Sequence, residues 1–157
     1  MKFESISLAI NLLENGHVIA IPTDTVYGLV CLPKFLDAID KIYELKGRPK
    51  EKKLITLTLT PPAIPPSLQP FADKHWPGPL TLIINGEGYR IPNHPITLAI
   101  LEQVGPLVST SVNRSGEKAA RIADEITLPV PILIGGPLPS GIPSTIISES
   151  GVLRSSS

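Results

Sequence analysis

Two polar segments of this sequence carry side chains that could bind phosphate groups. The first is "LKGRPKEKK", residues 45–53, in which five cations stand against one acid. Cations near the end of a helix also interact favourably with its dipole, and this structural role is the one we expect for Lys50, Lys52 and Lys53 from the residues alone. For Lys46 and Arg48 we favour a phosphate site. A compact ammonium group and a planar guanidinium fork complement each other around a polyphosphate.

The second segment is "STSVNRSGEKAA", residues 109–120. Ser111 and Asn113 lie two positions apart, so their side chains share a face if the preceding strand continues. Taken alone, the segment is typical of an Asx or ST turn that leads into a helix. Taken together with Lys46 and Arg48, it offers neutral hydrogen-bond donors for a nucleotide.

A third segment, "IPTDTVYGL" at residues 21–29, follows a predicted apolar strand. It contains more small hydrogen-bonding groups than a plain turn needs, which indicates a site for a small polar ligand. Two later residues point the same way. Arg90 lies in a predicted strand and needs an anionic partner if it faces the interior. Ser144 stands at the start of another predicted strand.

Composition excludes several classes of function. Lysine plus arginine and aspartate plus glutamate number 14 each, which argues against a protein whose whole surface binds nucleic acid, though not against a local basic groove. Cys31 is the only cysteine, so disulfides and cysteine-based zinc sites are excluded, and the chain fits a reducing, cytoplasmic compartment. The amphipathic N-terminal segment resembles neither a signal peptide nor a membrane span.

Motifs of other enzyme classes are absent from the sequence. It contains no Walker or Rossmann phosphate-binding motif, no G-x-S-x-G elbow and no acid–base dyad. His17, His75 and His94 are scattered, and we expect surface or packing roles for them and no metal site. Catalysis would therefore rest on positioning and electrostatics, which suits phosphoryl or nucleotidyl transfer.

Helices and strands alternate in the predicted structure. Helical spacing of apolar residues predicts helices from Ile6 to Leu13 and from Leu36 to Leu45, closed by Gly16 and Gly47, and a third helix at 96–105. Strands are predicted at 17–22, 54–59, 80–84, 89–91, 107–112, 132–134 and 144–147, with "NGEG" as a hairpin turn. The pattern predicts one α/β domain over residues 1–157 with a mixed sheet and a frayed tail at 155–157.

Seven segments, in order along almost the whole chain, resemble the YrdC family of threonylcarbamoyl-AMP synthases. They are "IPTDTVYGL", "LKGRP", "WPGPLTLI", "YRIPNHP", "STSVNRSG", "PSTII" and "VLR". The resemblance implies an open, twisted, mixed α/β sheet with flanking helices and a concave, electropositive groove. It also implies synthesis of L-threonylcarbamoyl-adenylate from L-threonine, bicarbonate and ATP, with release of pyrophosphate. A downstream transferase would then move the threonylcarbamoyl group to an adenosine of tRNA.

The resemblance further implies roles for individual residues, with Lys46 and Arg48 as the catalytic pair. The implied ATP contacts are Lys46, Arg48, Lys52, Ser111, Asn113 and Arg154, and the implied L-threonine contacts are Thr25, Arg90, Ser109 and Ser144. ATP would act as a substrate together with Mg²⁺, and neither a tightly bound cofactor nor a metal site made by the protein is implied.

The sequence departs from the family pattern at two places. "NGEG" replaces a longer segment, so that Gly86 stands where relatives often have threonine, and Lys53 stands where they often have proline. Both changes concern the region expected near ATP. The alternative function is an RNA-binding module that uses the same groove without catalysis. The neutral charge and the lack of stacking aromatic motifs favour the enzyme, with tRNA binding at most weak and no membrane partner.

Overall fold

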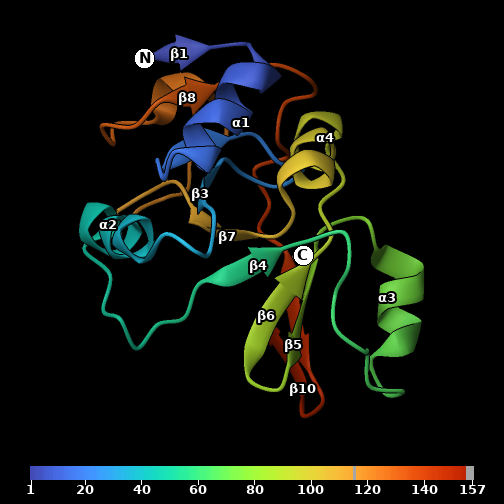
Figure 1. Cartoon of the computed structure of the whole chain (residues 1–157). Helices are drawn as coiled ribbons and strands as arrows, with labels where there is room; N and C mark the ends of the chain where they lie inside the picture. The colour runs from blue at the N-terminus through green and yellow to red at the C-terminus, as the bar shows by residue number, and fades with distance from the viewer. Residues whose placement is uncertain (115, 155–157) are drawn as a thin grey trace.

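A single ten-stranded mixed sheet organises the chain. The computed structural model describes residues 1–114 and 116–154 (Figure 1). Its strands are β1 (Lys2–Phe3), β2 (Ile19–Ile21), β3 (Gly28–Cys31), β4 (Ile55–Leu57), β5 (Leu80–Ile84), β6 (Glu87–Arg90), β7 (Leu107–Ser111), β8 (Ile132–Leu133), β9 (Thr145–Ser148) and β10 (Gly151–Arg154). Their order across the sheet is β1-β8-β2-β3-β7-β4-β6-β5-β9-β10. The sheet combines parallel pairs such as β4–β6 with antiparallel pairs such as β3–β7, which confirms the predicted open mixed sheet.

In the residues that the structure describes, four α-helices and one short 3₁₀ helix accompany the sheet. They are α1 (Ile6–Glu14), α2 (Leu36–Lys46), α3 (Gln69–His75), α4 (Pro95–Val104) and η1 (Ala123–Glu125). The side chain of Ser5 caps α1 by accepting a hydrogen bond from the amide of Leu8. The predicted glycine stops are confirmed, because Gly16 and Gly47 follow α1 and α2 with φ of 82° and 64°. His94 caps α4 through Nδ1, which confirms a structural role for this histidine.

Apolar side chains on the two faces of the sheet form two main cores. Ile19 and Ile21 of β2 pack with residues of α1 and α4, and these two helices lie side by side. Ala20, which points to the opposite face, packs with residues of α2. A smaller third cluster joins α3 to β5. The period of two along each strand therefore decides which side chains face α1 and α4 and which face α2.

Most predicted elements are present with shifted ends, and some were missed. The predicted strand at 17–22 shortens to Ile19–Ile21, and the predicted strand at 54–59 shortens to Ile55–Leu57. The hairpin turn is Asn85–Gly86 rather than the whole of "NGEG", because both residues have positive φ and Glu87 already pairs with Ile84. The sequence analysis missed β1, β3, α3, η1 and β10.

Two further expectations concern the C-terminal tail and membrane-spanning segments. The predicted frayed tail at 155–157 lies outside the described residues. Within the described part of the chain, no helix combines the length and the apolar character that crossing a membrane requires.

Candidate functional site

One cavity of about 320 Å³ lies on the face of the sheet that also carries α1 and α4. Its floor crosses the strands from β3 to β9, and the side chains that form it alternate along each strand. In β4 the register pairs Ile55 with both Ser109 of β7 and Gly88 of β6, and Gly88 pairs in turn with Ile83 of β5. All four of these residues line the cavity. The central strands thus build the floor of the site directly.

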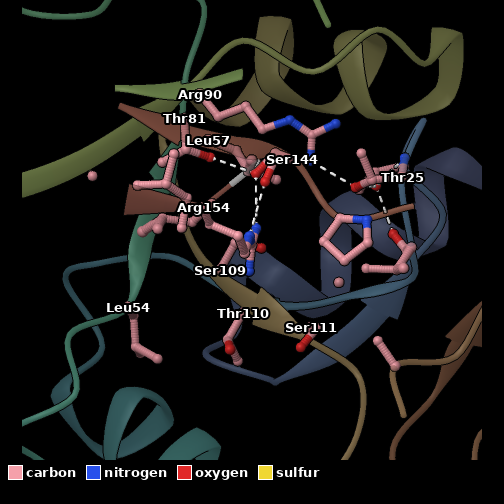
Figure 2. Close-up of a pocket in the computed structure, with 18 of the residues that line it drawn as sticks. Thr25, Leu54, Leu57, Thr81, Arg90, Ser109, Thr110, Ser111, Ser144 and Arg154 are labelled. Atoms are coloured by element: carbon pink, nitrogen blue, oxygen red, sulfur yellow. Dashed lines mark hydrogen bonds between the residues drawn. The ribbon is translucent and has the colours of Figure 1, made fainter. Parts of the chain in front are cut away.

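At one end of the cavity, Arg90 is held by three groups, of which Figure 2 labels Thr25. Its side chain is 5% exposed. Nε donates to the carbonyl of Gly78 at 3.1 Å, Nη1 donates to Oγ1 of Thr25 at 2.8 Å, and Nη2 forms an ion pair with the carboxylate of Asp24. Burial lowers the pKa of Arg90, while the nearby negative charge of Asp24 opposes that shift. Asp24 is the anionic partner that a buried arginine requires.

The turn that carries Asp24 and Thr25 is fixed by hydrogen bonds from two directions. Within the turn, Oγ1 of Thr23 donates to the carbonyl of Val26 at 2.6 Å and accepts from the amide of Thr25 at 3.2 Å. From outside, the amides of Ser140 and Gly141 donate to the carbonyls of Asp24 and Thr25 at 3.0 and 2.7 Å. The small polar residues of "IPTDTVYGL" therefore fix the turn and point Thr25 at Arg90.

Two hydroxyl groups and a second arginine complete this end. Oγ of Ser144 lies 2.8 Å from Oγ1 of Thr81. Arg154 reaches back from β10 and donates through Nε to the carbonyl of Ser144 at 2.9 Å and through Nη2 to its Oγ at 3.1 Å. Partial burial lowers the pKa of Arg154. Because two guanidinium groups converge on a lining that also carries hydroxyls, this end is suited to a small anion with polar substituents.

At the other end of the cavity, Arg48 and Lys53 supply positive charge. Arg48 donates to Oγ1 of Thr110 at 3.2 Å and to the carbonyls of Lys52 and Lys53 at 3.1 and 2.9 Å. Nζ of Lys53 pairs with Glu87 at 2.9 Å and lies 3.4 Å from the carbonyl of Gly86. The loop that follows α2 is thereby folded around the guanidinium of Arg48.

Lys46, the last residue of α2, is buried behind this end. Its Nζ donates to the carbonyl of Ser111 at 2.7 Å and to Oδ1 of Asn113 at 3.1 Å, and lies 3.4 Å from Oγ of Ser111. Oγ of Ser111 also donates to the same Asn113 oxygen at 2.5 Å. Burial, assisted by the charge of Arg48, lowers the pKa of Lys46 to about 8.

The structure brings most of the predicted site residues to this cavity. The predicted residues that line it are Thr25, Arg48, Arg90, Ser109, Ser111, Ser144 and Arg154. Lys46 and Asn113 adjoin it through Ser111 without lining it, and Lys52 contributes only its carbonyl, to Arg48. Among the described lining residues four are cations and none is acidic.

Sequence reasoning did not assign four residues that the geometry places at the site. They are Asp24, Lys53, Thr81 and Thr110. Two signals were available. Asp24 belongs to the polar segment and is an anion of the kind that a buried Arg90 requires. Thr81 is the polar residue of an otherwise apolar strand and shares a face with Ile83.

Within residues 1–114 and 116–154, no group of three or more histidine, cysteine, aspartate or glutamate side chains gathers in a way that could hold a metal ion. The lining cations suit phosphate oxygens instead.

Comparison with known proteins identifies relatives of the whole domain. The family model Sua5_yciO_yrdC, described as "Telomere recombination", matches residues 11–156. Threonylcarbamoyl-AMP synthase of Bacillus subtilis is 36% identical over 91% of this chain, which spans about half (49%) of that protein. The protein of the same name from Marinobacter nauticus is 33% identical, with 86% of this chain and 87% of that protein covered.

Solved structures agree with this assignment. Pyrococcus abyssi Sua5 ("P. abyssi Sua5"), solved in complex with L-threonine, has a TM-score of 0.80 and 27% identity, with 98% of this chain and 56% of that chain covered. Escherichia coli YciO has a TM-score of 0.78 at 22% identity, with 99% and 93% covered, which supports the fold alone. Both the sequence match and the shared fold confirm the resemblance drawn from the motifs. This chain belongs to the Sua5/YciO/YrdC family.

Proposed function

We propose that this protein is an L-threonylcarbamoyl-AMP synthase, a nucleotidyltransferase that uses L-threonine, bicarbonate and ATP and releases pyrophosphate. One observation carries the proposal. A single cavity joins a buried arginine–hydroxyl end, built by Arg90, Thr25 and Ser144, to a second cationic end, built by Arg48 and Lys53. The names of the relatives and the L-threonine complex of Sua5 support this function.

L-Threonine would bind at the Arg90 end. Three contacts to Gly78, Thr25 and Asp24 hold the guanidinium, and its further N–H groups can donate to the carboxylate of the amino acid. Hydroxyl groups of Thr25, Ser109 and Ser144 line the same cavity and can bind the polar groups of the ligand. Because Arg90 is fixed before the ligand arrives, little conformational freedom remains to be lost on binding.

ATP would place its phosphates at the Arg48 end. Arg48, Lys53 and Ser111 line this end. Lys46 stands behind Ser111 and hydrogen-bonds Asn113, so its charge acts on the phosphates at short range. Arg154 lines the cavity from β10 and can contact the same nucleotide. Mg²⁺, supplied together with ATP, would reduce the negative charge of the phosphates.

In the proposed reaction, the amine of threonine attacks bicarbonate, and a carbamate forms with loss of water. An oxygen of the carbamate then attacks the α-phosphorus of ATP. A new P–O bond forms as the bond to pyrophosphate breaks, and the protons released by the amine pass to solvent. Lys46 and Arg48 would stabilise the charge that develops on the phosphates, and Arg90 would hold threonine in line.

The RNA-binding alternative fits the geometry less well. Arg90 is 4% exposed, and the phosphate backbone of a polymer cannot reach a side chain buried to this degree. A backbone binder would also lose affinity steeply as salt is raised, whereas a small-ligand site would respond to threonine. Delivery of the product to tRNA by a downstream transferase remains part of the proposal, as does weak direct binding of tRNA.

Pyrophosphate release tests the proposed function. The purified chain is incubated with MgATP, and threonine and bicarbonate are added singly and together. We expect fast release only when all three substrates are present. A rate that does not rise when threonine and bicarbonate are added would refute the synthase.

A further inference from the structure

Gly88 lies at the centre of the cavity floor, in the interior of β6. It is buried, and it stands in the row that runs from Ser109 through Ile55 and Gly88 to Ile83. A glycine within a strand weakens the sheet and often marks a place where another group approaches the backbone closely. Gly88 is not among the glycines with positive φ, so the local backbone conformation does not require glycine. The presence of glycine at this position must therefore have another cause.

That cause is the limited space around Gly88. A Cβ atom at this position would lie 2.9 Å from Cγ2 of Ile55, and 3.4 Å from both Cδ1 of Ile83 and Cγ2 of Thr81. Three methyl groups therefore border a slot whose bottom is bare backbone. Gly86 differs, because its φ of +79° belongs to the hairpin turn and a Cβ there would meet only Nζ of Lys53, at 3.8 Å.

The slot lies between the two ends of the cavity. Two residues further along β6, on the same face, Arg90 contacts Thr25 and Asp24. Two residues before Gly88, the carbonyl of Gly86 lies beside Lys53, whose own carbonyl accepts from Arg48. Along a strand this places Gly88 about 7 Å from each neighbour on its face. A ligand that extends along β6 from Arg90 towards Lys53 crosses the backbone of Gly88.

We propose that the missing side chain at Gly88 keeps open the junction at which the two substrates meet. This inference rests on the proposed function, since it places the carbamate and the α-phosphate above Gly88. A methyl group at this position would hold the reacting atoms apart while leaving the contacts at either end in place. Gly88 would thus govern the reaction step more than the binding of either substrate.

The first test is the Gly88→Ala variant, studied by calorimetric titration and by pyrophosphate release. We expect threonine and ATP, titrated singly, to bind within about twofold of the wild type, since both ends are intact. The maximal rate should fall by about a hundredfold, the cost of displacing reacting atoms by roughly 1 Å. A purely structural role of Gly88 predicts instead that both affinities and the melting temperature fall together.

A second pair of variants separates obstruction of the ligand from crowding within the sheet. Ile55→Ala removes the methyl group that a new Cβ would meet, so Gly88→Ala has room to fold in that background. We expect the added methyl to lower the maximal rate relative to Ile55→Ala alone, with no further loss of melting temperature. An unchanged maximal rate on adding Gly88→Ala, in either background, would overturn the inference alone. A wild type that is inactive with all three substrates would overturn both the inference and the proposed function.

Discussion

Removal of the carboxylate of Asp24 should destabilise the ligand-free protein through Arg90. Arg90 is 4% exposed, its Nη2 is paired with Asp24, and the positive charge of Arg154 lies near enough to lower its pKa further. Breaking a buried ion pair from one side costs about 3–5 kcal/mol, because the remaining charge stays buried without compensation. The contacts of Arg90 to Thr25 and Gly78 persist, so we expect about 3 kcal/mol for Asp24→Ala.

For a domain of this size, such a loss lowers the melting temperature by about 6–12 °C. Thermal unfolding followed by circular dichroism measures it. Asp40→Ala is the matched control, because Asp40 forms an ion pair with Lys50 at 3.0 Å in which both side chains are more than half exposed (61% and 71%). An exposed pair contributes at most about 1 kcal/mol, so the control should melt close to the wild type.

The same melting experiment is repeated in the presence of threonine. If its carboxylate binds Arg90, it supplies the negative charge that Asp24→Ala lacks. Saturating threonine should then raise the melting temperature of Asp24→Ala by more than it raises that of the wild type. If Asp24→Ala and the Asp40→Ala control have the same melting temperature, the role of Asp24 is refuted. If threonine stabilises the wild type and Asp24→Ala equally, the substrate carboxylate does not bind Arg90.

The remaining predictions concern ligand binding and the cations of the site. Arg48→Ala should weaken ATP binding about tenfold or more, since a charge-assisted contact contributes about 1.5–3 kcal/mol. Lys46→Ala should weaken ATP binding less than Arg48→Ala does, because Lys46 lies behind Ser111 and acts through its charge. Unchanged affinity in both titrations would place the nucleotide elsewhere. ATP affinity should fall as the pH rises above about 8, where Lys46 loses its proton, and Lys46→Met should abolish that dependence in titrations across this range. Because the unfolded chain holds this proton up to a pKa near 10.5, the difference in the free energy of unfolding between the wild type and Lys46→Met should rise between about pH 8 and 10.5. The difference isolates Lys46, because the raised pKa values of buried Cys31 and Tyr27 act in both proteins and in the opposite direction. Arg90→Lys keeps the charge but loses the planar fork, so threonine affinity should fall more than ATP affinity. In the wild type, threonine should improve ATP binding, and equal ATP affinity with and without it would disprove this coupling.

The elements that were predicted correctly are those whose signals are local. Asn85 and Gly86 adopt the positive φ values of a tight hairpin, and the apolar run "LTLII" marked β5 on one side of it. The helix α3 was not predicted, although a proline is compatible with the start of a helix. Pro70 lies in the first helical turn, where its missing amide costs nothing.

The candidate site was predicted as a set of residues, but not as a set of contacts. Thr25 and Arg90 meet across 65 positions of sequence, and Lys46 meets Asn113 across 67. Such contacts depend on strand order and register, and no local pattern carries that information. For the same reason the sequence did not show that Lys46 lies behind Ser111, since this depends on a hydrogen bond between the end of α2 and the end of β7.

Four cations of the site share one feature, a hydrogen bond to a main-chain carbonyl. Arg48 donates to the carbonyls of Lys52 and Lys53, and Lys46 donates to the carbonyl of Ser111. Arg90 donates to the carbonyl of Gly78, and Arg154 donates to the carbonyl of Ser144. A carbonyl is present whatever side chain its residue bears. Substitutions at positions 52 and 53 therefore leave the orientation of the Arg48 side chain unchanged. Inserting or deleting one residue in that loop shifts both of the carbonyls that accept its hydrogen bonds. The geometry of this site is thus tolerant of changes in residue type and sensitive to changes in chain length.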